Sequence, residues 1–115
     1  KLFASLLGTT HYKVEEVESE AVKTSFFKSG PNKIELLQAT DPKSPIAKFI
    51  EKKGEGIHHI AFEVIDITSE ITRLKREGFI VLNETPKRGA DNKLVAFLHP
   101  RSSNGVLIEL CQETN

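Results

Sequence analysis

The chain has 115 residues, of which 38% are hydrophobic and 28% are charged. This length supports one small domain with its own core, and the residue balance excludes a disordered chain. Lysine and arginine number 16, as do aspartate and glutamate, so the formal net charge is zero and nothing favours nucleic acid as a partner.

The sequence also indicates the environment of the protein. No apolar run approaches the ~20 residues of a membrane span, and no secretory signal peptide is visible. Cys111 is the single cysteine, so no disulfide can form within the chain. These features predict a cytoplasmic protein that has no membrane partner.

The chain opens on what the pattern predicts to be the end of a helix. Leu6 and Leu7 are followed by Gly8, a residue that commonly stops helices. We therefore expect that further residues precede Lys1.

Seven strands are predicted from short or alternating apolar runs bounded by turn residues. In chain order they are residues 11–17, 22–27, 33–38, 57–64, 79–82, 94–99 and 106–111. Two further helices lie between them. One begins at Ser44, an N-cap residue followed by proline, and the other follows Asp66 or Thr68 and ends at Gly78.

The two halves of the chain show the same order of elements. The second half runs strand, helix and three strands, and the first half runs helix and three strands. The tripeptide Ile-Glu-Leu closes both halves, at residues 34–36 and 108–110. This degenerate repeat predicts an α+β fold of two βαβββ modules. Module one spans 1–39, a connection spans 40–56 and module two spans 57–115, with the first strand of module one missing.

Strand periodicity places one metal-ligand type of side chain on each of three strands. His59, Glu35 and Glu109 each point away from the aliphatic face of their strand. A carboxylate among aliphatic residues is costly unless a cation compensates it. Two carboxylates and an imidazole that converged on one face would suit a divalent ion such as Mn, Co, Ni, Mg or Zn.

Each candidate also has an ordinary structural interpretation. Glu35 or Glu109 alone would usually be a solvated side chain on an open sheet face. His58 is expected to be a packed or hydrogen-bonded core residue, His11 an exposed one, and Cys111 a small buried hydrophobe. The repetition of glutamate in both halves is what favours the metal site.

Two long segments carry a resemblance to a known family. They are KIELLQATDPKSPIAKFIEKKGEGIHHIAFEV and NETPKRGADNKLVAFLHPRSSNGVLIELC. The layout of paired modules resembles the vicinal oxygen chelate superfamily, and the motifs are similar to those of its methylmalonyl-CoA epimerase family. The pieces HHIAFEV and GVLIEL are shared with glyoxalase-like relatives, whereas the connection SPIAKFIEKKGEGIHH is more specific.

The resemblance implies a set of metal ligands. These would be Glu35, His59 and Glu109, together with a histidine on the first strand, which this chain does not contain. A chain without that strand is expected to bind metal poorly. The resemblance further implies a homodimer with an acyl-CoA substrate.

The resemblance also implies a reaction. Glu109 would remove the proton from the carbon between the thioester and the carboxylate, while the metal stabilises the enolate. A second acid or base is unassigned, because the family's position falls on Thr24 or Lys23, with Glu18 or Glu20 near it. Two alternatives stay open: a glyoxalase I-like lactoylglutathione lyase, and a metal-free small-molecule-binding protein of the same fold.

Overall fold

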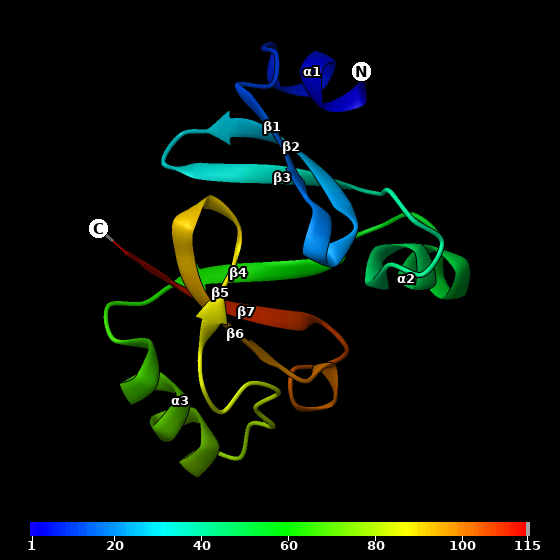
Figure 1. Cartoon of the computed structure of the whole chain (residues 1–115). Helices are drawn as coiled ribbons and strands as arrows, with labels where there is room; N and C mark the ends of the chain where they lie inside the picture. Colours follow the sequence, from blue (N-terminus) through cyan, green and yellow to red (C-terminus); the bar gives the residue numbers. More distant parts are fainter. Residues whose placement is uncertain (115) are drawn as a thin grey trace. The chain divides into compact units, whose positions relative to one another are not determined.

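The computed structural model describes residues 1–114, apart from the side chain at position 90, and its chain forms two compact units (Figure 1). The units are Lys1–Gly56 and Ile57–Asn115, and each has its own β-sheet. Helices and sheets occur together, which confirms the predicted α+β class. The helices of residues 1–114 are all too short or too polar to span a lipid bilayer.

The first unit is an antiparallel sheet with two helices. Its elements in chain order are α1 (Leu2–Leu7), β1 (Lys13–Val17), the 3₁₀ turn η1 (Glu18–Glu20), β2 (Val22–Ser29), β3 (Asn32–Ala39) and α2 (Pro45–Lys53). The sheet order is β1-β2-β3. The Ala47 N–H donates to Ser44 Oγ at 3.0 Å, which confirms Ser44 as the cap that begins α2.

The second unit is a mixed sheet with one helix. Its elements are β4 (His59–Glu63), α3 (Ile67–Arg76), β5 (Lys87–Arg88), η2 (Ala90–Asn92), β6 (Lys93–Leu98), η3 (Pro100–Ser102) and β7 (Leu107–Glu113). The sheet order is β4-β7-β6-β5, with β4 parallel to β7 and the other pairs antiparallel. Asp66 Oδ1 accepts the Ser69 N–H, so Asp66 is the residue that caps α3.

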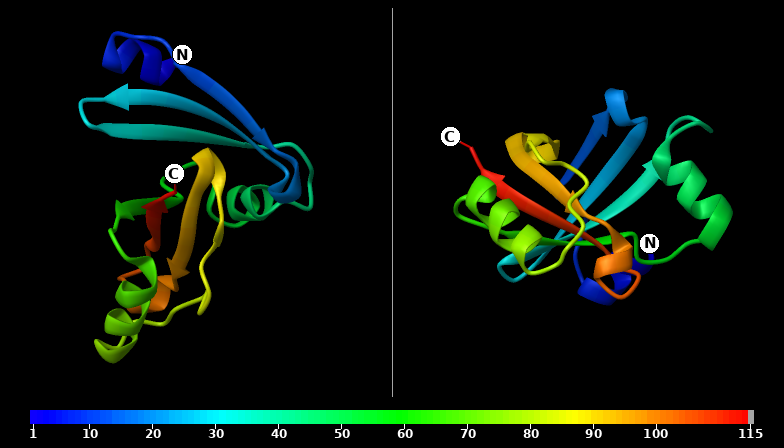
Figure 2. Two further views of the ribbon diagram at one scale, coloured as in Figure 1. Left: turned by 60° about the vertical axis from the view of Figure 1, so that its left-hand side comes forward. Right: turned by 90° about the horizontal axis from the view of Figure 1, so that it is seen from below.

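The core of the second unit lies between α3 and one face of its sheet, as Figure 2 shows. The buried side chains of this core come from the helix and from β6 and β7: Ile67, Ile71, Leu74, Ala96, Leu98 and Leu110. They recur at helical spacing in α3 and at every second residue in β6. The opposite face of the sheet is therefore left for other side chains.

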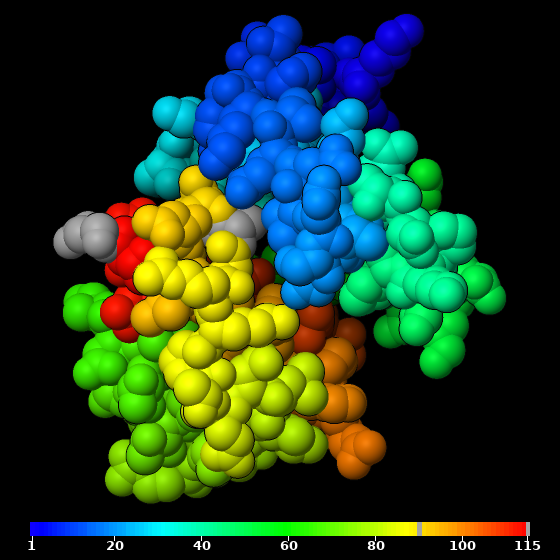
Figure 3. Space-filling model, in the orientation of Figure 1, coloured from blue at the N-terminus to red at the C-terminus, as the bar shows by residue number. Residues whose placement is uncertain are grey.

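The strand predicted at residues 79–82 does not form. Only Val81 makes a bridge, to Leu98, and the Ile80 N–H donates instead to Ser102 Oγ. Because this donor bonds outside a ladder, the segment pairs too briefly with β6 to be a strand. The sheet is completed by β5, which the sequence pattern did not indicate. The stretch between α3 and β6, yellow-green to yellow in Figure 3, lies on the visible surface.

Truncation of the α3 core should destabilise the protein measurably. Ile71 is 4% exposed, so Ile71→Ala should cost about 2–5 kcal/mol of unfolding free energy, because it leaves a cavity. Urea denaturation followed by circular dichroism measures this loss. Arg76→Ala, at an exposed position of the same helix, is the matched control. Equal midpoints for the two variants would contradict this account of the core.

Candidate metal and proton-transfer site

The neighbouring strands β4 and β7 bring His59 and Glu109 together. Their parallel register pairs Ala61 with Glu109, which places Glu109 on the same face as His59. His59 Nε2 lies 2.9 Å from Glu109 Oε1, and the two side chains are 16% and 17% exposed. Ile108 and Leu110 point to the α3 core instead. The expected orientation of Glu109, away from its aliphatic neighbours, is confirmed.

An aromatic ring and a cation lie beside this pair. Phe97 on β6 is directly opposite Glu109, and its ring centroid is 6.2 Å from that of His59, edge to face. The Lys87 ammonium lies 5.9 Å from the centre of the Phe97 ring. The face thus combines an imidazole, a carboxylate, an aromatic ring and an ammonium group. Partial burial strengthens the electrostatic interactions among them.

His58 contacts the other side of the His59 ring. The two Nδ1 atoms are 2.9 Å apart, and the rings are perpendicular with centroids at 5.1 Å. Burial lowers the pKa of His58, as does the nearby charge of His59, while Glu109 raises it. Nδ1 of a neutral His58 can accept a hydrogen bond from the Nδ1–H of His59, so the expectation of a hydrogen-bonded histidine is confirmed.

Glu35 lies on β3 of the first unit, where it is opposite Phe26. Its Oε2 is 3.8 Å from Lys33 Nζ, and its side chain is 27% exposed. Within residues 1–114, no three or more His, Cys, Asp or Glu side chains are grouped as a metal site. Two of the three predicted ligands are therefore in contact, and the complete ligand set stays a prediction.

The donor atoms of His59 and Glu109 suit a divalent ion. Two ligands at a right angle on an ion with bonds of about 2.1 Å are about 3.0 Å apart. The observed separation of Nε2 and Oε1 is 2.9 Å, which is close to this value and is equally the length of a direct hydrogen bond between an imidazolium and a carboxylate. An imidazole nitrogen with a carboxylate oxygen suits the borderline and hard ions that the sequence predicts.

Glu15 is a carboxylate that the sequence analysis did not consider, and its Oε1 lies 3.5 Å from Lys13 Nζ. This residue lies on β1 opposite Thr24, on the same face of the first sheet as Glu35. Its Oε1 atom is shielded from solvent and has no hydrogen-bond partner among the described residues. The strand alternation Lys13, Glu15, Val17 is the signal that could have placed it on this face.

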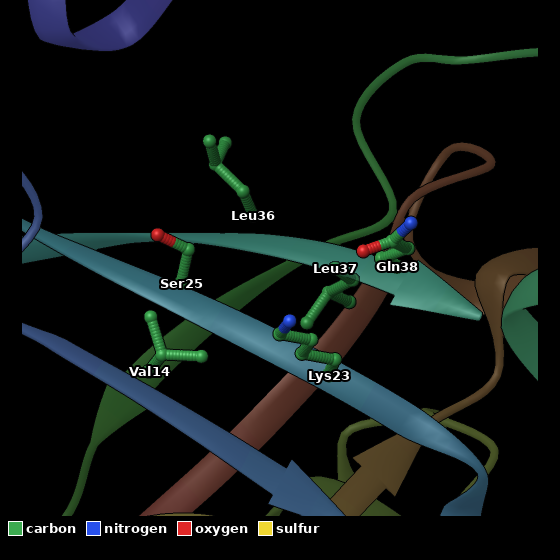
Figure 4. A pocket seen from close by; sticks show the side chains of 6 residues that line it. All are labelled: Val14, Lys23, Ser25, Leu36, Leu37 and Gln38. Atoms are coloured by element: carbon green, nitrogen blue, oxygen red, sulfur yellow. The ribbon is translucent and has the colours of Figure 1, made fainter. Parts of the chain in front are cut away.

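Two hollows lie away from these residues. One, of about 350 Å³, lies mainly on the opposite face of the first sheet, and Figure 4 shows Val14, Ser25 and Leu36 among its lining side chains. The other, of about 450 Å³, is on the α3 side of the second sheet and is lined in part by Phe62 and Leu74. Neither hollow is lined by His59, Glu35 or Glu109.

Residues 1–97 match the model of the Glyoxalase/Bleomycin resistance/Dioxygenase superfamily. Three relatives extend this match. An uncharacterized protein of Bacillus subtilis is 37% identical over 96% of the chain and 79% of its own length. A mitochondrial methylmalonyl-CoA epimerase of Dictyostelium discoideum is 47% identical over 84% of the chain, which spans 58% of that enzyme. An ethylmalonyl-CoA/methylmalonyl-CoA epimerase of Cereibacter sphaeroides is 51% identical over 77% of the chain and 69% of its own length.

Solved structures show the same likeness. A hypothetical protein from Bacillus halodurans has a TM-score of 0.94 and 44% identity, over 99% of this chain and 83% of its own. A methylmalonyl-CoA epimerase in complex with methylmalonyl-CoA and NH4+ has a TM-score of 0.85 and 28% identity, over 98% of this chain and 83% of its own. The vicinal oxygen chelate fold expected from the sequence is thereby confirmed.

Proposed function

Because the chain belongs to the glyoxalase/bleomycin resistance/dioxygenase superfamily, and within it to the methylmalonyl-CoA epimerases, we propose that it interconverts the two stereoisomers of methylmalonyl-CoA. The observation that carries this proposal is the contact between His59 and Glu109, which joins a metal-ligand type of side chain to a potential base. The family's enzyme class is isomerase, in agreement with the sequence prediction.

The proposed metal ligands are His59, Glu109 and, from the first unit, Glu35. The 2.9 Å contact supports the pairing of His59 with Glu109, and Glu35 is proposed from the family resemblance. A bound divalent ion would supply stabilisation of the negative charge that the enolate places on the thioester oxygen. Co, Mn, Ni, Mg and Zn all suit these donor atoms.

Glu109 is the proposed general base. Its carboxylate removes the proton from the carbon between the thioester and the carboxylate of the substrate. Phe97, beside the His59 ring, keeps an apolar surface next to this carboxylate, which limits competing water. His58 holds the His59 ring in place when its Nδ1 accepts the hydrogen bond that His59 Nδ1–H donates, which would leave Nε2 of His59 unprotonated and able to bind a metal ion.

An activity assay separates this function from the alternatives. The metal-loaded, full-length protein should epimerise methylmalonyl-CoA and leave the glutathione hemithioacetal of methylglyoxal unchanged. The reverse result would assign a lactoylglutathione lyase. If the protein holds no metal, gains none on titration and turns over neither substrate, it is a binding protein of the same fold.

The remaining parts of the proposal concern partners and location. The acyl-CoA substrate follows from the complex of the related epimerase with methylmalonyl-CoA. A homodimer and a cytoplasmic location are proposed from the sequence and the resemblance. Sedimentation of the full-length protein and imaging of a tagged copy check these two points.

A further inference from the structure

The substrate of the proposed reaction carries a negative charge next to the reacting carbon. In methylmalonyl-CoA this carbon bears a free carboxylate, and the proposed base, Glu109, is an anion as well. The two charges repel each other unless cations lie near them. We propose that Lys87 binds the free carboxylate of the substrate and so selects malonyl-type acyl-CoA esters. This inference rests on the epimerase function proposed above.

The register of the second sheet places Lys87 on the face of the proposed site. Lys87 on β5 is opposite Val95 on β6, and Phe97, the next residue of β6 on the same face, is opposite Glu109 on β7. Three neighbouring strands of one unit therefore present Lys87, Phe97 and Glu109 on the face that is turned away from the α3 core.

The ring of Phe97 connects Lys87 with the proposed site. The Lys87 ammonium lies over this ring, 5.9 Å from its centre, and the His59 ring meets the same ring edge to face, with 6.2 Å between the centres. The face of an aromatic ring attracts a cation. The ring also keeps water away from one side of the ammonium, which strengthens the attraction between this cation and an anionic ligand.

Close packing fixes the strand that carries Lys87. Although β5 has only two residues, the Gly89 N–H donates to the Lys93 carbonyl oxygen at 2.8 Å, directly after the strand. A Cβ atom at position 89 would lie only 2.8 Å from a methyl carbon of Val95, so the two backbones approach as closely as glycine allows. The Lys87 side chain therefore starts from a well-defined position.

The carboxylate of the acyl group is the anion that this position favours. It is bonded to the carbon that Glu109 would deprotonate, whereas the long pantetheine arm separates the phosphates of coenzyme A from the thioester. An ammonium group has three N–H donors, so a carboxylate can be added to the contacts that Lys87 already makes. The resulting charge-assisted hydrogen bond is strong, and an acyl group without a carboxylate cannot form it.

The first test is the steady-state kinetics of Lys87→Met in the metal-loaded, full-length protein. Methionine keeps an unbranched side chain beside Phe97 but removes the charge. Because the carboxylate is present in the substrate and in the enolate alike, KM for methylmalonyl-CoA should rise by about 10–100-fold while kcat changes by less than about threefold. Lys87→Arg restores a cation that also stacks on aromatic rings, so it should keep KM closer to that of the wild type.

The second test compares the binding of malonyl-CoA with that of propionyl-CoA, which lacks the free carboxylate. In isothermal titration, Lys87→Met should bind malonyl-CoA about 10–100-fold more weakly than the wild type does. Its affinity for propionyl-CoA should be unchanged, which also shows that the variant is folded. Equal losses for the two ligands would assign Lys87 to the coenzyme and overturn the proposal.

Lys75→Met is the matched control, because it removes the same charge from α3, on the other side of the sheet. Lys75 pairs there with Glu84 at 2.6 Å, at an exposed position, and its loss should leave both affinities at wild-type values. An unchanged KM in Lys87→Met, with an active wild type, would overturn the role of Lys87. A wild type that does not epimerise methylmalonyl-CoA would instead reject the epimerase function, and the role of Lys87 with it.

Discussion

Glu109→Gln should reduce the rate of epimerisation by about a thousandfold, the largest effect expected for any single substitution. The glutamine amide removes no proton, and general base catalysis contributes about 10²–10⁴ in rate. It also withdraws the anionic oxygen that lies 2.9 Å from His59 Nε2. Initial rates with saturating metal and substrate measure the change in kcat.

Glu113→Gln is the control for this substitution. It removes a carboxylate from the same strand, but one whose side chain is 67% exposed. If Glu113→Gln keeps wild-type activity while Glu109→Gln is inactive, the loss of activity is specific to the carboxylate of Glu109. A Glu109→Gln protein that kept more than about a tenth of wild-type kcat would argue against Glu109 as the base.

His59→Ala should weaken metal binding by more than about 100-fold. Loss of a residue that merely supports a metal ligand costs about 10–100-fold in affinity, and removal of the ligand itself should exceed this. The ring also contacts His58 and Phe97, so its loss disorganises the face as well. Isothermal titration of the metal-free, full-length protein gives the affinity without any reference to activity.

His11→Ala is the control for the imidazole, because His11 is exposed and lies on a loop of the first unit. Its metal affinity should equal that of the wild type. The thermal midpoint of each metal-free variant shows whether a loss of binding reflects unfolding. Equal metal affinity in His59→Ala and wild type would remove His59 from the ligand set.

Local sequence patterns were enough to predict the ends of a helix, the face that Glu109 occupies and the family. The cap at Ser44 and the stop at Gly54 define α2 within a few residues, because hydrogen bonds at helix ends involve near neighbours. Period-two alternation assigned Glu109 to the face away from the core. The motif resemblance identified the family, as the relatives confirm.

Only the tertiary structure decided which of these side chains meet. β4 pairs with β7 although some 40 residues separate them, and this parallel register is what brings His59 to Glu109. Long-range pairing also decides which segments join β6. Residues 87–88 pair with β6 as the edge strand β5, whereas residues 79–82 form a single bridge to it, from Val81 to Leu98. The shielding of Glu15 likewise depends on what packs over its strand. Alternation tells which face a residue occupies, but long-range pairing selects its neighbours.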